Sequence, residues 1–170
     1  LGIGFLLTVL MQSSSAALTV ILTSTAGGLL TLSTGGAMVI GANIGTTSTA
    51  ALAVIGATPN AKRVACAHLA FNLITGMVAI LTLFPFLATL TLIRKSLGLD
   101  SEPTAILALF HTTFNIFGVL LLWPMTGKLA KFLETKFQTS EEIESKPLFL
   151  DQTTTSTPSL GLNALLLELE

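Results

Sequence analysis

Three long windows without a single Asp, Glu, Lys or Arg set the strongest limit on what this chain can fold into. They cover residues 1–61, 64–93 and 103–127. A helix needs about 20 apolar residues to cross a bilayer, so each window can hold a span. Only 10% of the residues are charged, whereas about a quarter are charged in ordinary soluble domains. The sequence therefore predicts an all-α membrane protein.

Other properties of the sequence exclude several classes of protein. The net charge of −1 gives no electrostatic case for a nucleic-acid partner. The single cysteine, Cys66, cannot form a disulfide within the chain. Repeated apolar windows and the lack of a basic start are not typical of a secretory signal peptide. The chain begins at Leu1 and stops within an amphipathic run, so we expect a fragment of a longer protein.

The first window is divided into short segments by polar residues. Two apolar arms, residues 3–11 and 16–22, flank the run QSSS at residues 12–15. Arms of about ten residues suit a re-entrant hairpin better than a full crossing, and we predict this hairpin over residues 3–30. Residues 34–56 are long enough to span, but GANIGTT at residues 41–47 interrupts them. This interruption predicts a broken helix, which membranes tolerate only where backbone lines a cavity or is buried in protein.

Two further spans are predicted at residues 64–92, with a candidate kink at Pro85, and at residues 104–124. Lys128, Lys131 and Lys136 follow the last span, and the positive-inside rule places them in the cytoplasm. The Lys62–Arg63 loop then also lies inside, and the loop at residues 94–102 lies outside. The hairpin accordingly opens to the outer face, and the C-terminal tail is cytoplasmic.

The last part of the chain has a different composition. Residues 134–156 turn polar and predict a flexible cytoplasmic linker. Thr157 followed by Pro158 is typical of a helix start, with threonine as the cap and proline in the first helical position. Leucines then recur at roughly helical spacing. Residues 157–170 are therefore expected to begin a cytoplasmic helical region that the sequence truncates.

The two polar interruptions supply uncharged ligands at apparent membrane depth. Gln12, Ser13, Ser14 and Ser15 offer an amide and three hydroxyls, and Asn43, Thr46 and Thr47 add a second amide and two hydroxyls. Neutral oxygens suit sodium, whereas hydroxyls and backbone N–H groups suit an oxyanion. Small residues can instead serve helix packing, since Gly41 and Gly45 form a GxxxG pattern. Taken alone, either interruption fits packing or binding equally, and the presence of both favours binding.

A second polar pattern, His-x-x-Phe-Asn, occurs in each of the last two spans. It contains His68 with Asn72 and His111 with Asn115, and each pair lies on one helix face. Hydrogen bonding between helices is the favoured interpretation, with an accessory functional role as the alternative. A serine hydrolase would need an Asp or Glu in a span. Cys66 and His68 point to different faces and cannot share a zinc ion. We therefore predict no enzymatic activity.

Together these motifs, over residues 1–133, resemble the sodium/phosphate cotransporter type II family, in particular its bacterial branch. The resemblance implies two inverted repeats with a shared site, of which this chain is the second, followed by a PhoU-like helical domain. It implies hairpin ligands at Gln12, Ser13, Ser14 and Ser15, and broken-helix ligands at Asn43, Thr46 and Thr47. Sodium would be held by Gln12, Ser14, Asn43 and Thr46.

The resemblance implies sodium-coupled inorganic phosphate transport across the cell membrane, with sodium as coupling ion and no other cofactor. The family carries two QSSS runs and this chain carries one. The other half of the site would therefore come from a first repeat or from a second, antiparallel copy of this chain. Two alternatives stay open: phosphate export, and a membrane regulatory or assembly module that does not itself transport.

Overall fold

The computed structural model describes residues 1–100, 102–138 and 158–168, and within these residues every regular element is a helix. The prediction of an all-α protein is confirmed. The elements in chain order are α1 (Gly2–Met11), α2 (Ser14–Ala26), α3 (Leu32–Ala53), α4 (Pro59–Leu81), α5 (Leu83–Ser96), α6 (Pro103–Leu122), the 3-10 turn η1 (Trp123–Met125), α7 (Thr126–Glu134) and α10 (Pro158–Glu168).

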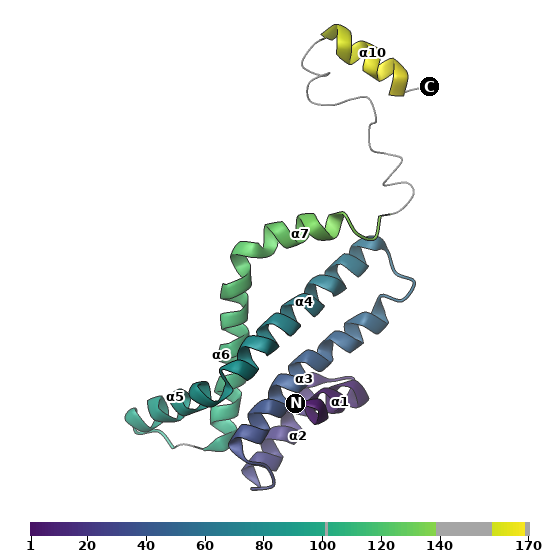
Figure 1. Ribbon diagram of the computed structural model, residues 1–170. Helices are drawn as coiled ribbons and strands as arrows, with labels where there is room; N and C mark the ends of the chain where they lie inside the picture. Colours follow the sequence, from purple (N-terminus) through teal and green to yellow (C-terminus); the bar gives the residue numbers. More distant parts are fainter. Residues whose placement is uncertain (101, 139–157, 169–170) are drawn as a thin grey trace.

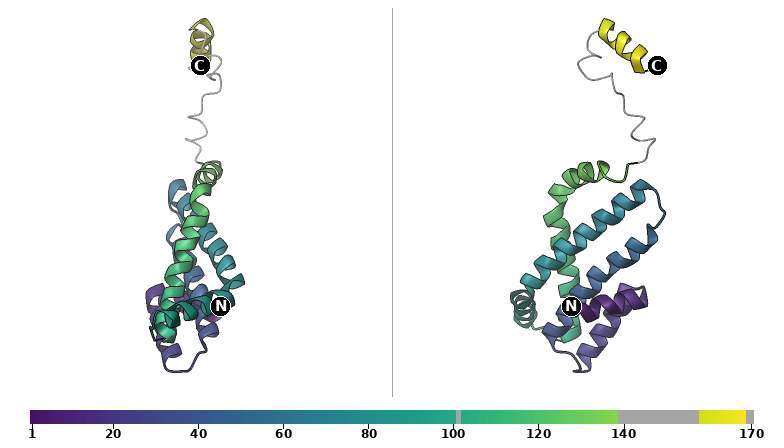
Figure 2. Two further views of the ribbon diagram at one scale, coloured as in Figure 1. Left: turned by 90° about the vertical axis from the view of Figure 1, so that its left-hand side faces the viewer. Right: turned by 45° about the vertical axis from the view of Figure 1, so that its right-hand side comes forward.

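Helix α3 is the centre of the arrangement, because α1, α2, α4, α5 and α6 all pack against it. Figure 1 shows α3 and α4 as an antiparallel pair joined by a short loop, with α1 and α2 against the first half of α3. The two rotated views in Figure 2 show α6 running alongside this pair, and α7 bends across the end of the pair, where it contacts α4. The polar segment of α3 thus lies among several helices.

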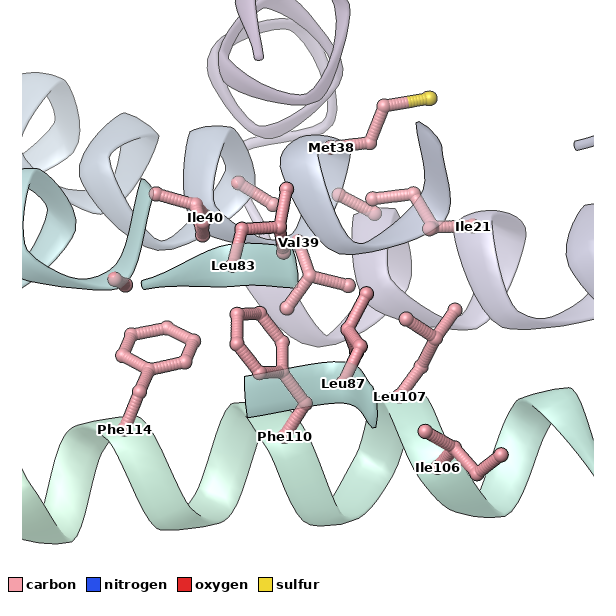
Figure 3. Close-up of a cluster of buried hydrophobic side chains, with 13 residues drawn as sticks. Ile21, Met38, Val39, Ile40, Leu83, Leu87, Ile106, Leu107, Phe110 and Phe114 are labelled. Carbon is pink, nitrogen blue, oxygen red and sulfur yellow. The ribbon is translucent and has the colours of Figure 1, made fainter. Parts of the chain in front are cut away.

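The core is formed where α2, α3, α5 and α6 meet (Figure 3). Val39 and Ile40 of α3 and Phe110 of α6 are almost completely buried there. The Phe110 ring meets Phe86 of α5 edge-on, with 5.3 Å between the ring centroids. Such pairs contribute about 0.5–1.5 kcal/mol beyond the burial of their surface. This cluster fixes the start of α3, and thereby the surface on which α1 packs.

The expected hairpin is present as two short helices joined at the QSSS run. Gln12 has a left-handed conformation, with φ of 51°, and ends α1. Ser13 then caps α2, since its Oγ accepts a hydrogen bond from the Ala16 amide at 3.2 Å. A serine cap stabilises a helix start by about 1 kcal/mol, so the turn is encoded locally. The re-entrant character of the hairpin stays a prediction.

The predicted break at residues 41–47 is wrong, because α3 is one continuous helix of 22 residues. The hydroxyls that suggested an interruption bond back to carbonyls of their own helix. Thr46 donates to the Asn43 carbonyl at 2.6 Å, and Thr47 donates to the Ile44 carbonyl at 2.7 Å. The glycines are covered by α1, so the helix does not need to open at these positions.

The single span predicted at residues 64–92 is also wrong, because this segment forms two helices. Helix α4 ends at Leu81 and α5 begins at Leu83, and Figure 1 shows the two pointing in different directions. Pro85 explains the position of this break, since a proline ring clashes with the carbonyl four residues earlier, here that of Leu81. The sequence identified the proline but placed the change of direction a turn too late.

The last predicted span corresponds to α6, which continues through η1 into α7. Arg63, at the start of α4, ties this region to the α3–α4 loop. Its Nε donates to the Lys136 carbonyl at 3.0 Å, and its Nη1 donates to the Asn60 side chain at 2.8 Å. The two basic segments predicted to share one side of the membrane therefore lie at the same end of the molecule.

In the tail, α10 begins at Pro158, where the sequence predicted the first helical residue. The expected cap Thr157 and residues 139–156 of the expected linker lie outside the described residues.

Candidate substrate and ion site

The hairpin turn places two hydroxyl groups at the beginning of α2, one on the half-buried Ser14 and one on the exposed Ser15. Ser14 and Ser15 occupy the first turn of that helix, and neither side-chain hydroxyl has a hydrogen-bond partner among the described residues. The Gln12 side chain instead donates to the Val9 carbonyl at 2.6 Å. A helix start carries unpaired N–H groups and the positive end of the helix dipole. The turn thus presents donors of a kind that suits an anion.

The polar side chains of α3 are placed differently. Thr47 is buried, whereas Asn43 and Thr46 are half-buried. Because each threonine donates its hydroxyl proton to a carbonyl of α3, each oxygen keeps lone pairs and has no proton left to give. These groups are therefore acceptors, and acceptors suit a cation.

Helix α1 connects the two polar segments by packing closely on α3. A Cβ added to Gly4 would overlap with the Met38 backbone, and one added to Gly45 would lie 2.7 Å from the Thr8 Cβ. The buried Thr8 hydroxyl donates to the Ala42 carbonyl at 3.0 Å. Thr8 was missed by the sequence analysis, although its four-residue spacing from Gly4 is the small-xxx-small pattern of close helix pairs.

The structure does not join the two polar segments directly. Within the described part of the chain, no hydrogen bond links residues 12–15 to Asn43, Thr46 or Thr47. The connection runs along α1, which packs on α3 from Gly4 to Thr8 and whose last residue precedes Gln12. The hairpin and α3 thus form one packed unit that fixes the start of the QSSS turn relative to α3.

Asn43 also links α3 to α4. Its Nδ2 donates to the Oδ1 of Asn72 at 2.8 Å, and Asn72 is only 3% exposed. Asn72 Nδ2 in turn donates to the His68 carbonyl at 3.0 Å. The first His-x-x-Phe-Asn copy therefore contacts a residue that the sequence assigned to the ion site.

The second copy makes only part of this arrangement. Asn115 Nδ2 donates to the His111 carbonyl at 2.8 Å, as in the first copy. In the described structure, however, Asn115 has no hydrogen bond to another helix. The His111 ring meets Phe114 of its own helix edge-on, with centroids 5.6 Å apart.

A cavity of about 570 Å³ lies between α3 and α4 on the side of the Arg63 contact. Thr47 and Ser48 line it from α3, and Lys62 and Phe137 line it at the end with the basic loops. A second cavity, of about 580 Å³, lies among α4, α5 and α6, and its walls are mostly apolar. The described residues contain no cluster of three His, Cys, Asp or Glu side chains, so a cation bound here would need neutral oxygens.

Two helical stretches are long and apolar enough to cross a membrane, Pro59–Leu81 and Pro103–Glu134. Only 22% and 28% of their most apolar windows are buried inside the molecule. Most of these apolar side chains therefore face outward, whereas the core helix of a soluble protein is mostly buried.

Comparison with known proteins identifies several relatives of this chain. The protein named "Putative inorganic phosphate export protein YjbB" from Escherichia coli (strain K12) is 31% identical over 163 residues, which are 94% of this chain and 29% of that protein. Its namesake from Salmonella typhimurium is 31% identical over 162 residues, with the same coverage. "Uncharacterized protein YqeW" from Bacillus subtilis is 34% identical over 125 residues, 74% of this chain and 39% of that protein.

This chain thus spans less than a third of the length of the relatives named for phosphate export. No solved structure matches it. The family model for the Na+/Pi-cotransporter matches residues 1–101, which include the hairpin, α3 and α4. With its outward-facing apolar helices, the chain is a membrane protein. It belongs to the Na+/Pi-cotransporter family.

Proposed function

We propose that this chain supplies one half of the substrate and ion site of a sodium-coupled phosphate transporter in the cell membrane. The observation that carries this proposal is the pair of hydroxyls at Ser14 and Ser15, which stand unpartnered among the described residues at the start of α2. Hydroxyls and N–H groups at a helix start are the donors that bind phosphate in many proteins.

Charge balance supports the choice of sodium as the coupling ion. Neither the hairpin nor α3 contains a charged side chain, because residues 1–61 carry none. A phosphate anion bound there would lack a protein cation to offset its charge in a low-dielectric environment. The acceptor oxygens of Asn43 and Thr46 are suited to a cation at the same site. Sodium binding would then make phosphate binding more favourable, which is the coupling that a symporter needs.

The same proposal includes a membrane topology. The end that carries Lys62, Arg63 and the lysines of α7 faces the cytoplasm, together with the C-terminal tail. The chain crosses the membrane several times, and the remaining half of the site is contributed by an inverted repeat or by an antiparallel second copy.

The proposal is tested by measuring phosphate transport by the full-length protein. After reconstitution into liposomes, radioactive phosphate uptake is measured under an inward sodium gradient and under an equal potassium gradient. We expect uptake in sodium only. Equal uptake in both cations would refute sodium coupling. Absence of phosphate transport with the sodium gradient directed inward and also with it directed outward would refute transport.

Export is the second candidate for the direction of transport, because relatives of this chain are named for phosphate export. The direction is tested in cells loaded with labelled phosphate. Faster loss of label on expression of the protein, under an ordinary inward sodium gradient, would favour export, and faster accumulation would favour import.

A further inference from the structure

The hydrogen bonds around Asn72 determine the orientation of two amide groups. The His68 carbonyl can only accept a hydrogen bond, so the side-chain group 3.0 Å from it must be the NH₂ of Asn72. The Oδ1 of Asn72 then faces α3. Since an oxygen facing a second amide can only accept, the group of Asn43 at 2.8 Å must be its NH₂. A backbone carbonyl of α4 thereby sets the orientation of a side chain on α3.

The consequence is that the side-chain oxygen of Asn43, Oδ1, points away from Asn72. No described residue donates a hydrogen bond to this Oδ1. Among the described residues that are not exposed, no buried side-chain oxygen or nitrogen lacks a partner. Asn43 is half-buried, so its unpaired Oδ1 is not fully buried and keeps some accessible surface. An oriented, uncharged and accessible oxygen is thus presented beside the polar segment of α3.

The chemical nature of the Asn43 Oδ1 atom indicates which ligand it can bind, sodium or phosphate. An amide carbonyl oxygen is a ligand for hard cations and carries partial negative charge, so it would repel phosphate oxygens. We infer that Asn72 is a positioning residue. It turns the side-chain oxygen of Asn43, Oδ1, toward the coupling cation and so sets the affinity for sodium rather than the affinity for phosphate. This inference rests on the proposed function, because it concerns the sodium of that same site.

The second His-x-x-Phe-Asn copy provides a matched control within the chain. Asn115 makes the same bond to the carbonyl four residues earlier, although it is half-buried whereas Asn72 is buried. It differs in having no described bond to a second helix. Replacing either asparagine removes the same local bond, and only replacement of Asn72 releases Asn43.

The test compares Asn72→Leu with Asn115→Leu in the reconstituted protein at the length its gene encodes. Half-saturating sodium is measured at saturating phosphate, and half-saturating phosphate at saturating sodium. Loss of a residue that orients a cation ligand typically lowers cation affinity about 10–100-fold. We expect Asn72→Leu to raise half-saturating sodium by about tenfold and to leave half-saturating phosphate nearly unchanged. Asn115→Leu should change neither value.

Two further variants keep the test decisive if Asn72→Leu does not fold. In Asn72→Ser the short hydroxyl can bond to its own helix but cannot reach Asn43, so the loss of sodium affinity should recur. In Asn72→Asp a carboxyl oxygen still accepts from Asn43, and sodium affinity should not fall. A change confined to phosphate affinity would overturn the inference. Equal effects of Asn72 and Asn115 replacement, or a weakened Asn72→Asp variant, would also overturn it.

A binding measurement separates this inference from the proposed function. A ligand that binds the native state raises the melting temperature by mass action, so the sodium-dependent rise can be measured without transport. Sodium should stabilise the unmodified protein at lower concentration than Asn72→Leu. If sodium stabilises both equally, the positioning role of Asn72 is excluded even when sodium-driven uptake is observed. If sodium-driven uptake is absent but the two proteins differ in sodium stabilisation, the proposed transport fails and the positioning role stands.

Discussion

The QSSS turn and the polar segment of α3 have similar compositions but form different structures. Both contain small and hydroxyl-bearing residues within long apolar windows. At the turn, Gln12 has a left-handed backbone and the chain starts a new helix at Ser14. In α3 the helix continues through Gly41 and Gly45 without a break. Polar residues in an apolar window thus do not by themselves show where a helix ends.

The difference comes from what surrounds each segment. Gly41 and Gly45 of α3 are covered by α1, which approaches so closely that a Cβ would not fit at either position. At the turn, Ser13 supplies a side-chain cap and stabilises a helix start. The α3 segment is therefore a packing surface with acceptor oxygens at its edge, and the turn carries hydroxyl donors at Ser14 and Ser15 that have no partner among the described residues.

The largest effect on stability is expected from a larger side chain at Gly45, where α1 packs on α3. In Gly45→Val, even the first carbon would lie 2.7 Å from the Thr8 Cβ and 2.9 Å from the Phe5 carbonyl oxygen. Because backbone must move to relieve this contact, we expect a loss of about 3 kcal/mol or more, at or above the upper end for overpacked cores. The yield of folded protein after detergent extraction should fall sharply.

Gly127→Val is the control for this prediction, because no atom lies within 4 Å of a Cβ at Gly127. Its yield should stay close to that of the unmodified protein. A Gly45→Val protein with normal yield and melting temperature would contradict the close packing of α1 on α3.

The next effect concerns the hydroxyl donors of the turn. Ser14→Ala and Ser15→Ala each remove a hydroxyl that makes no described bond within the protein, so stability should hardly change. A hydrogen bond to a charged ligand contributes about 1.5–3 kcal/mol, which corresponds to about 10–100-fold in affinity for phosphate. Half-saturating phosphate should rise accordingly in liposome uptake.

Ser13→Ala is the informative partner of these variants. Ser13 accepts from the Ala16 amide, so its loss should also cost about 0.5–2 kcal/mol of stability. A melting temperature that falls in Ser13→Ala alone, with transport reduced in all three variants, is the expected pattern. Normal phosphate affinity in all three would contradict the assignment of this turn to the site.

A smaller effect is expected from Thr46→Val on α3. The Thr46 hydroxyl donates to the Asn43 carbonyl, so its oxygen can contribute only lone pairs to a ligand. Loss of one neutral interaction of about 0.5–1 kcal/mol should raise half-saturating sodium about 2–5-fold and leave phosphate affinity unchanged. Thr49→Val is the control, because Thr49 makes the same bond one turn further along, to the Thr46 carbonyl at 2.7 Å. Equal effects of both variants on sodium would point to helix stability instead.

These regions also show how far the sequence predicts the fold. The charge-free windows and the caps are local signals, so the helical class, the hairpin turn and the start of α10 at Pro158 were predicted. The continuity of α3 was not, because it depends on α1 covering Gly41 and Gly45. The break at residue 82 was placed too late, since a proline acts on the carbonyl four residues before it.

The candidate site divides in the same way. The sequence analysis identified Asn43 and Asn72, because asparagine is an unusual residue type in an apolar window. Their contact depends on how α3 and α4 are paired, and no spacing along the chain encodes that register. Thr8 was missed since a threonine in a short apolar helix is common, and its importance comes from the Ala42 carbonyl opposite it.

The smallest effect is expected at the histidines. The bonds around His68 and His111 use their backbone carbonyls, which accept from Asn72 and Asn115. Replacement of the ring leaves these bonds in place. His68→Gln and His111→Gln should therefore keep most transport activity, and His68→Leu and His111→Leu should lower folded yield only slightly, because neither ring makes a hydrogen bond within the described structure.

The dependence of uptake on pH decides whether either ring has more than this packing role. Histidine ordinarily titrates near pH 6.5, so a ring that exchanges a proton with phosphate would shape uptake between pH 6 and pH 8. Glutamine does not titrate but still donates and accepts hydrogen bonds. If the rings only pack, the pH profile of each Gln variant should superimpose on that of the unmodified protein. A displaced optimum at normal expression in one variant would assign that histidine to the transport reaction. It would also extend the functional site from the turn and α3 to α4 or α6.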